Sequence, residues 1–183
     1  MIALASIVSE RYALSLYEVA KAEGLAEQFL RELTDVARVF ETYPEYLKVL
    51  VTPSIAFENK KTSLCEVFSG RVHPYVLNFL MLITEKGRVG AIAEMAQAYK
   101  ELYYFEEGIC EVVAVTAAPI SEANIKKLTA KMEAVTGKKV VLNNKVDPKV
   151  IGGVMVRIEN NQIDATIKTR LSELAQQLSQ TIA

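Results

Sequence analysis

The segment Val140–Glu159 reads VVLNNKVDPKVIGGVMVRIE and decides the architecture of the second half of the chain. Apolar, largely β-branched residues stand on both sides of the Asp147-Pro148 pair, a pattern typical of two strands separated by a turn. The pattern predicts strands over 139–146 and 154–158. The Gly152-Gly153 pair lets the backbone bend, or lets another backbone approach closely, where the second strand begins.

The residues around this segment complete a small α+β domain. Residues 111–116 form a β-branched run that predicts a further strand, and Ser121 is a suitable N-cap for a helix that ends at Gly137. Asn160-Asn161 suits a tight hairpin turn, after which a near-heptad pattern predicts a final helix. The change of period at Gly108 predicts a domain over residues 108–183.

Residues 1–107 show a different period. Apolar side chains recur at helical spacing in about six consecutive stretches, which glycines and prolines separate from one another. Amphipathic helices joined by short connections form bundles. We therefore expect an all-α N-terminal six-helix bundle followed by the small α+β C-terminal domain.

Composition excludes several classes of protein. The formal net charge is −1, so the basic surface of a nucleic-acid-binding protein is missing, and no polybasic cluster indicates an anionic membrane surface. No apolar run approaches the roughly 18 residues of a membrane-spanning helix. The N-terminus has no signal-peptide pattern, so Cys65 and Cys110 are interpreted as free thiols in a reducing compartment.

No catalytic, metal or cofactor site is predicted. The single histidine, His73, precedes Pro74 at a helix start, where a capping or surface role fits best, and the cysteine spacing matches no zinc motif. Gly137-Lys138 is not a phosphate-binding loop, because Met132 replaces the first glycine and Lys139 replaces the final Ser or Thr.

Two acidic residues in the strand region have simple structural explanations. Asp147 precedes Pro148 and starts a turn, while Asp164 lies near the start of the final helix, where a carboxylate favours the helix dipole. Neither residue indicates catalysis.

The segment Val140–Glu159 is similar throughout to the signature of ATP synthase delta subunits, whose mitochondrial counterpart is the oligomycin-sensitivity-conferring protein. Val146 and Asp147 occupy the signature's apolar-polar pair, Gly152-Gly153 its small-Gly step, and Arg157 its basic position. Further segments resemble the family in the same order along the chain: 11–20, 84–89, 115–121, Ile163-Asp164 of the family's final strand, and Ile167 with Arg170-Leu171 of its final helix.

The resemblance implies a non-catalytic connector in the stator of a rotary proton-translocating ATP synthase. The first domain docks the alpha/beta catalytic head and the second contacts the peripheral-stalk b subunits, so that rotor torque drives ATP synthesis. The expected location is the cytoplasmic face of the bacterial inner membrane, with the membrane reached only through the complex. A generic helical adaptor unconnected to ATP synthase, or an enzyme with an unrecognised site, are the alternatives.

The resemblance also implies positions for the interfaces. The alpha-subunit N-terminal helix would lie in a groove between the first and fifth helices, lined by Val8, Tyr12, Ser15, Tyr75, Phe79 and Leu82. For the apolar members of this set, burial in the bundle core is the alternative. Asp147, Gly152, Gly153 and Arg157 would have structural or stalk-side roles, to which the seam Leu171, Leu174 and Leu178 could add.

Overall fold

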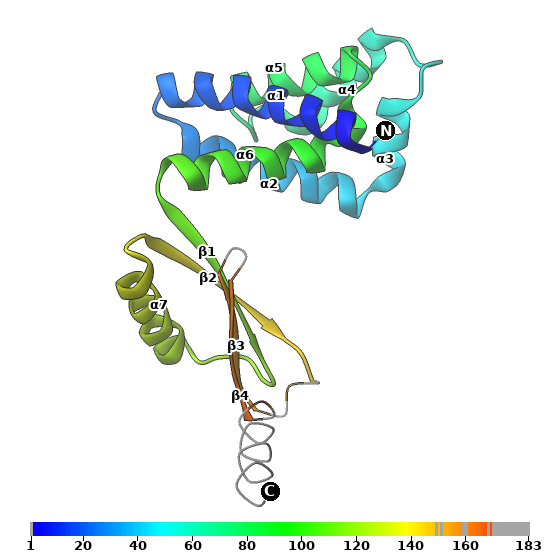
Figure 1. Cartoon of the computed structure of the whole chain (residues 1–183). Helices are drawn as coiled ribbons and strands as arrows, with labels where there is room; N and C mark the ends of the chain where they lie inside the picture. Colours follow the sequence, from blue (N-terminus) through cyan, green and yellow to red (C-terminus); the bar gives the residue numbers. More distant parts are fainter. Residues whose placement is uncertain (1, 149, 151, 159–160, 168, 170–183) are drawn as a thin grey trace, which may run out of the picture. The chain divides into compact units, whose positions relative to one another are not determined.

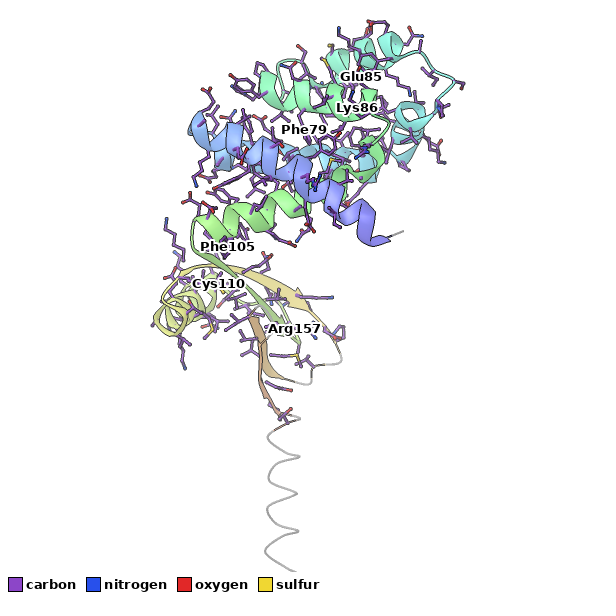
Figure 2. The ribbon with its side chains drawn as sticks, turned by 45° about the horizontal axis from the view of Figure 1, so that its top comes forward. Phe79, Glu85, Lys86, Phe105, Cys110 and Arg157 are labelled. Atoms are coloured by element: carbon purple, nitrogen blue, oxygen red, sulfur yellow. The ribbon has the colours of Figure 1, made fainter. Side chains whose placement is uncertain are left out.

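A computed structural model of the chain describes residues 2–148, 150, 152–158, 161–167 and 169 (Figure 1). The chain divides into two compact units, 1–103 and 104–183. Figure 2 shows the side chains, with Phe79 in the first unit and Cys110 and Arg157 in the second. The predicted order, helices first and a small sheet afterwards, is confirmed.

The first unit is built from helices and one short 3₁₀ helix. In chain order these are α1 (Ile2–Ala22), α2 (Ala26–Thr42), α3 (Pro44–Val51), α4 (Phe57–Phe68), α5 (Pro74–Glu85), η1 (Val89–Ala91) and α6 (Ile92–Glu106), whose last turn extends into the second unit.

The helix ends follow local chemistry. Gly87, with φ of 66°, turns the chain after α5, as its position in the sequence predicts. At the other end of α5, Pro74 occupies the first turn, and His73 Nδ1 accepts a hydrogen bond from the Tyr75 backbone N–H at 3.4 Å. The His73 backbone N–H donates to Glu32 Oε2 on α2 at 2.7 Å. The predicted capping role of His73 is therefore confirmed.

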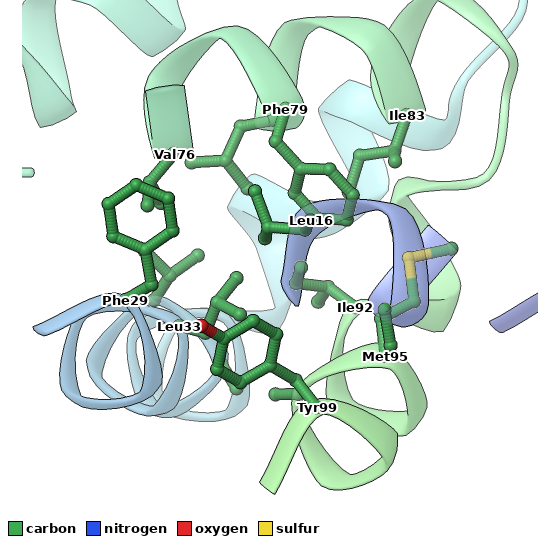
Figure 3. Packing of buried hydrophobic residues seen from close by; sticks show 14 of the residues in the cluster. Leu16, Phe29, Leu33, Val76, Phe79, Ile83, Ile92, Met95 and Tyr99 are labelled. Carbon is green, nitrogen blue, oxygen red and sulfur yellow. The ribbon is translucent and has the colours of Figure 1, made fainter. Parts of the chain in front are cut away.

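The core of the first unit lies where α1, α2, α5 and α6 meet (Figure 3). Helix α1 packs between α5 and α6, since the Tyr12 ring contacts Phe79 and the Tyr17 ring contacts Tyr99, with centroids 6.4 and 5.6 Å apart. The Tyr99 hydroxyl donates to the Ala26 carbonyl at 3.1 Å, and burial raises the pKa of Tyr99.

The described residues of the second unit form a four-stranded sheet on which helix α7 packs. These elements are β1 (Ile109–Thr116), α7 (Glu122–Thr136), β2 (Lys139–Val146), β3 (Gly153–Ile158) and β4 (Asn161–Thr166). The strand order is β2-β1-β3-β4, with β1 and β2 parallel and the other neighbours antiparallel. The strands predicted over 111–116, 139–146 and 154–158 are confirmed to within two residues at each end.

The fourth strand corrects one expectation. Asp164 was expected near the start of the final helix, but it pairs with Met155 inside β4. The strand forms although its sequence, NQIDAT, is largely polar, because β3 offers an adjacent row of backbone hydrogen-bond partners. Ile163-Asp164, which resemble the family's final strand, lie inside it. The seam Leu171, Leu174 and Leu178 lies outside the described residues.

Helix α7 covers one face of this sheet. Met132 and Leu128 of α7 pack on Cys110, Val112, Val140 and Val156 of the strands. Because side chains alternate along a strand, Arg157 and Val141 lie on the other face. Gly137, with φ of 67°, ends α7 as predicted, and Ser121 occupies the N-cap position without a side-chain cap bond.

Replacing Tyr99 with Phe tests the core of the first unit. We expect the free energy of unfolding to fall by about 1 kcal/mol, because the Ala26 carbonyl loses its side-chain donor. Urea unfolding followed by circular dichroism would measure the change. The matched control is Tyr43→Phe, since the Tyr43 side chain is 62% exposed and should lose less than about 0.5 kcal/mol. Equal losses in both variants would contradict the prediction.

Candidate partner-binding surfaces

Helices α1 and α5 run antiparallel and bring together the residues predicted to line a groove. Midway along α1, the Tyr12 ring has the Arg88 guanidinium above it, 5.7 Å from the ring centroid. Beyond the end of α1, Glu23 Oε1 accepts a hydrogen bond from the Tyr75 hydroxyl at 3.4 Å. We call the surface between these two contacts the α1–α5 surface.

The six predicted residues occupy different depths of this surface. Phe79 is 7% exposed and belongs to the bundle core, where its ring underlies Tyr12. Val8 and Tyr12 are half-buried, and Ser15 is exposed, with its hydroxyl donating to the Arg11 carbonyl at 3.0 Å. Tyr75 and Leu82 are 41% and 43% exposed. The surface therefore has a buried aromatic base and exposed apolar walls.

Three further residues extend the α1–α5 surface. Val19 follows Tyr12 by seven positions, so it shares its face of α1, and its side chain is 40% exposed. That spacing was visible in the sequence. Glu23 and Arg88 give the two ends of the surface opposite charges. Their positions depend on contacts between residues far apart in the chain, so no local sequence pattern indicates them.

A wider apolar hollow lies elsewhere on the first unit. It has a volume of about 740 Å³ between α2, α3 and α4, with Val39 and Val67 among its lining residues. Tyr43 at its edge is 62% exposed. Sequence analysis did not indicate this hollow, because its walls come from three separate helices.

Backbone hydrogen bonds fix the conformation of the signature segment around Asp147. The Asp147 N–H donates to the Thr116 carbonyl at 2.9 Å, and the Asp147 carbonyl accepts from Val150 N–H at 3.0 Å. These bonds form a turn at Asp147, as the sequence predicts. A second contact supports the same strand ends, because the Asn144 side chain donates to the Ala114 carbonyl and to Thr116 Oγ1.

Gly152 and Gly153 determine the backbone conformation at the start of β3. Gly153 has φ of 84°, a region that residues with a Cβ rarely adopt. The Gly152 carbonyl accepts from Ile167 N–H at 3.0 Å, and a Cβ on Gly152 would stand 2.8 Å from Ile167 Cδ1. Both glycines thus serve the close join between β3 and the residue after β4.

Arg157 is a charged signature residue whose side chain is exposed. It lies on the sheet face that α7 does not cover, in register with Val113 of β1 and Gln162 of β4. Val141 on the same face is 37% exposed. This face thus offers a partner apolar surface together with a guanidinium.

The described residues contain no cluster of three or more His, Cys, Asp or Glu side chains that could hold a metal ion. Across the same part of the chain, no helix has the length and apolar character needed to cross a membrane. The features that stand out are therefore the surfaces described above.

The sequence of this chain is similar to one family of known proteins along most of its length. Residues 8–178 match the family described as ATP synthase delta (OSCP) subunit. The chain is 36% identical to ATP synthase subunit delta of Alkaliphilus oremlandii, covering 98% of this chain and 99% of that protein. It is 34% identical to the Clostridioides difficile subunit delta, covering 97% and 99%. A chain of the Toxoplasma gondii mitochondrial ATP synthase hexamer shares the fold, with a TM-score of 0.69 at 21% identity, covering 93% and 96%.

Alanine substitutions of the two glycines should differ in effect. Gly153→Ala should lower the free energy of unfolding by about 1–2 kcal/mol, because a Cβ is strained at positive φ. Gly152→Ala should cost less, since the tip of the Ile167 side chain can move aside. Hydrogen exchange of the β1 and β3 amides would measure both variants. A larger effect at Gly152 would show that side-chain crowding, rather than backbone strain, limits this site.

Proposed function

Since the chain belongs to the ATP synthase delta (OSCP) subunit family, and is thus a non-catalytic peripheral-stalk subunit of ATP synthase, we propose that its first unit docks the catalytic head and its second unit binds the stalk. The corresponding domains predicted from the sequence are residues 1–107 and 108–183, whose boundary lies close to that between the two compact units. The observation that carries the proposal is the α1–α5 surface, which exposes apolar side chains that the bundle itself does not use.

The head-side partner is the amphipathic N-terminal helix of an alpha subunit. A helix that docks in a groove buries apolar residues spaced by three or four positions, and it needs an apolar groove of matching length. Tyr75 and Leu82 lie about two turns apart on α5, and Val8, Tyr12 and Ser15 follow the facing side of α1. Phe79 contributes as the base of the surface rather than as an exposed contact.

The stalk-side partners are the b subunits. Arg157 and Val141, which are exposed on the sheet face opposite α7, provide contacts for a helix end. Asp147, Gly152 and Gly153 act indirectly, because their backbone geometry fixes where β3 begins. The assembly sits on the cytoplasmic face of the bacterial inner membrane, and this subunit reaches the membrane only through its partners.

The task of such a subunit is mechanical. The stator must hold the catalytic head while the rotor turns inside it, so the connector needs affinity rather than chemistry. A nanomolar dissociation constant corresponds to roughly −12 kcal/mol. An interface of about 1,200–2,000 Å² is the usual size for a stable protein contact.

Titration calorimetry of the full chain with a synthetic peptide of the cognate alpha subunit's N-terminal helix tests this proposal. We expect one-to-one binding that Leu82→Ala and Tyr12→Ala each weaken at least about tenfold, or about 1.4 kcal/mol. The matched control is Leu14→Ala. Leu14 is 45% exposed, close to the value for Leu82, but it lies on the other side of α1 from Tyr12.

The outcomes separate the function from the site. Binding that the three substitutions leave equally strong would place the alpha-subunit helix elsewhere on this protein. An absence of binding by a folded chain would instead favour a generic helical adaptor.

A further inference from the structure

A small cavity adjoins one end of the α1–α5 surface. It has a volume of about 320 Å³ and is lined by Val8, Ser9, Val51, Gly87, Arg88, Gly90, Ala91 and Met95. We call it the Gly90 cavity. Val8 belongs both to this cavity and to the predicted groove, and Arg88 lines the cavity while stacking on Tyr12. The cavity therefore continues the α1–α5 surface around the start of α1.

The cavity is formed because η1 approaches α1 and α3 without filling the space between them. Val89 is completely buried and anchors η1 to the core, whereas the next residue, Gly90, has no side chain. Val51, the last residue of α3, forms the facing wall and is 44% exposed. A Cβ built on Gly90 would stand 3.6 Å from Val51 Cγ2, an ordinary contact distance.

The lining is suited to an apolar group with a negative charge beside it. Ser9 is 2% exposed, and its hydroxyl is already satisfied by donating to Glu94 Oε2 at 3.1 Å. The remaining walls are apolar side chains and glycine backbone, apart from Arg88. A guanidinium that stacks on a ring by its face can still donate hydrogen bonds from its edge, in a geometry that fits a carboxylate.

We propose that the Gly90 cavity is an anchor subsite for the docked alpha-subunit helix. It takes one large apolar side chain of that helix, and Arg88 pairs with a carboxylate near this side chain. The inference rests on the proposed function, because it deepens the same interface. The volume is at the lower end for ligand-binding cavities, so it admits a single side chain but no second helix.

An anchor of this kind should contribute more to affinity than the open parts of the surface. A few side chains that fit well-packed hollows carry most of the binding energy of an interface, while most other contacts contribute little. The Gly90 cavity is an open hollow with walls from α1, α3 and η1, so a partner side chain seated in it would contact all three elements at once.

Filling the cavity from inside tests the proposal. Gly90→Leu in the full chain should weaken binding of the alpha-subunit peptide at least tenfold, and Gly90→Ala should weaken it less. The matched control is Ala93→Leu, which adds the same side chain at an exposed position on α6 outside the cavity lining and should leave binding unchanged. Thermal unfolding of each variant would show whether it is folded.

The peptide supplies an independent measurement. Each large apolar residue of the peptide is replaced by Ala, and each acidic residue by its amide. One apolar replacement in the peptide should weaken its binding to the wild-type chain at least tenfold. The same replacement should change the affinity for the Gly90→Leu variant little. One acidic replacement in the peptide should weaken binding to the wild-type chain but not to the Arg88→Gln variant. Two residues in contact show this coupling in a double-mutant cycle. If Gly90→Leu does not fold, Val51→Phe fills the cavity from its other wall.

The results distinguish this inference from the proposed function. Peptide binding that Gly90→Leu and Val51→Phe leave unchanged would overturn the anchor subsite and keep the interface. Failure of the wild-type chain to bind would remove both. Sedimentation of the chain without peptide gives the last comparison, because a dimer that Gly90→Leu dissociates would assign the cavity to a second copy of this chain.

Discussion

Helix α5 is apolar over more of its circumference than the bundle can cover, and this constraint shapes the first unit. Val76, Leu80 and Ile83 face the core and are completely buried. Phe79 lies at the edge of that face and is covered by Tyr12. Tyr75 and Leu82 lie farther around the helix, beyond the reach of α1, so they remain exposed. The α1–α5 surface thus exists because the neighbouring helices cover only part of the apolar circumference of α5.

The two units present partner surfaces in different ways. In the first unit, the surface is formed by apolar side chains of α5 that the other helices leave exposed. Phe79 is buried beneath this surface and contacts Tyr12. In the described part of the second unit, α7 covers one face of the sheet, and Arg157 and Val141 are exposed on the opposite face.

Much of this architecture could be predicted from the sequence, because helix ends and strands depend on local chemistry. His73, Gly87 and Gly137 mark their helix ends through properties of a few adjacent residues. The strand β4 could not be read from its own composition, since its polar residues gain their structure from pairing with β3. The helical period does not distinguish exposed Val19 from buried Leu16, because only packing decides which side of an apolar helix is covered. The Gly90 cavity and the position of Arg88 require contacts between α1, α3 and η1, which no local pattern specifies.

The position of β1 within the sheet has a consequence for how this subunit carries load. The chain passes from α6 through Gly108 directly into β1, which is an interior strand paired with β2 on one side and β3 on the other. Tension along the chain at this point would therefore pull β1 lengthwise. Its hydrogen bonds to both neighbours lie across that direction and would resist together in shear, instead of opening one after another as they would at the end of a hairpin. In the proposed connector role, the periodic pull that comes with every turn of the rotor would pass through the part of the sheet that is hardest to peel apart.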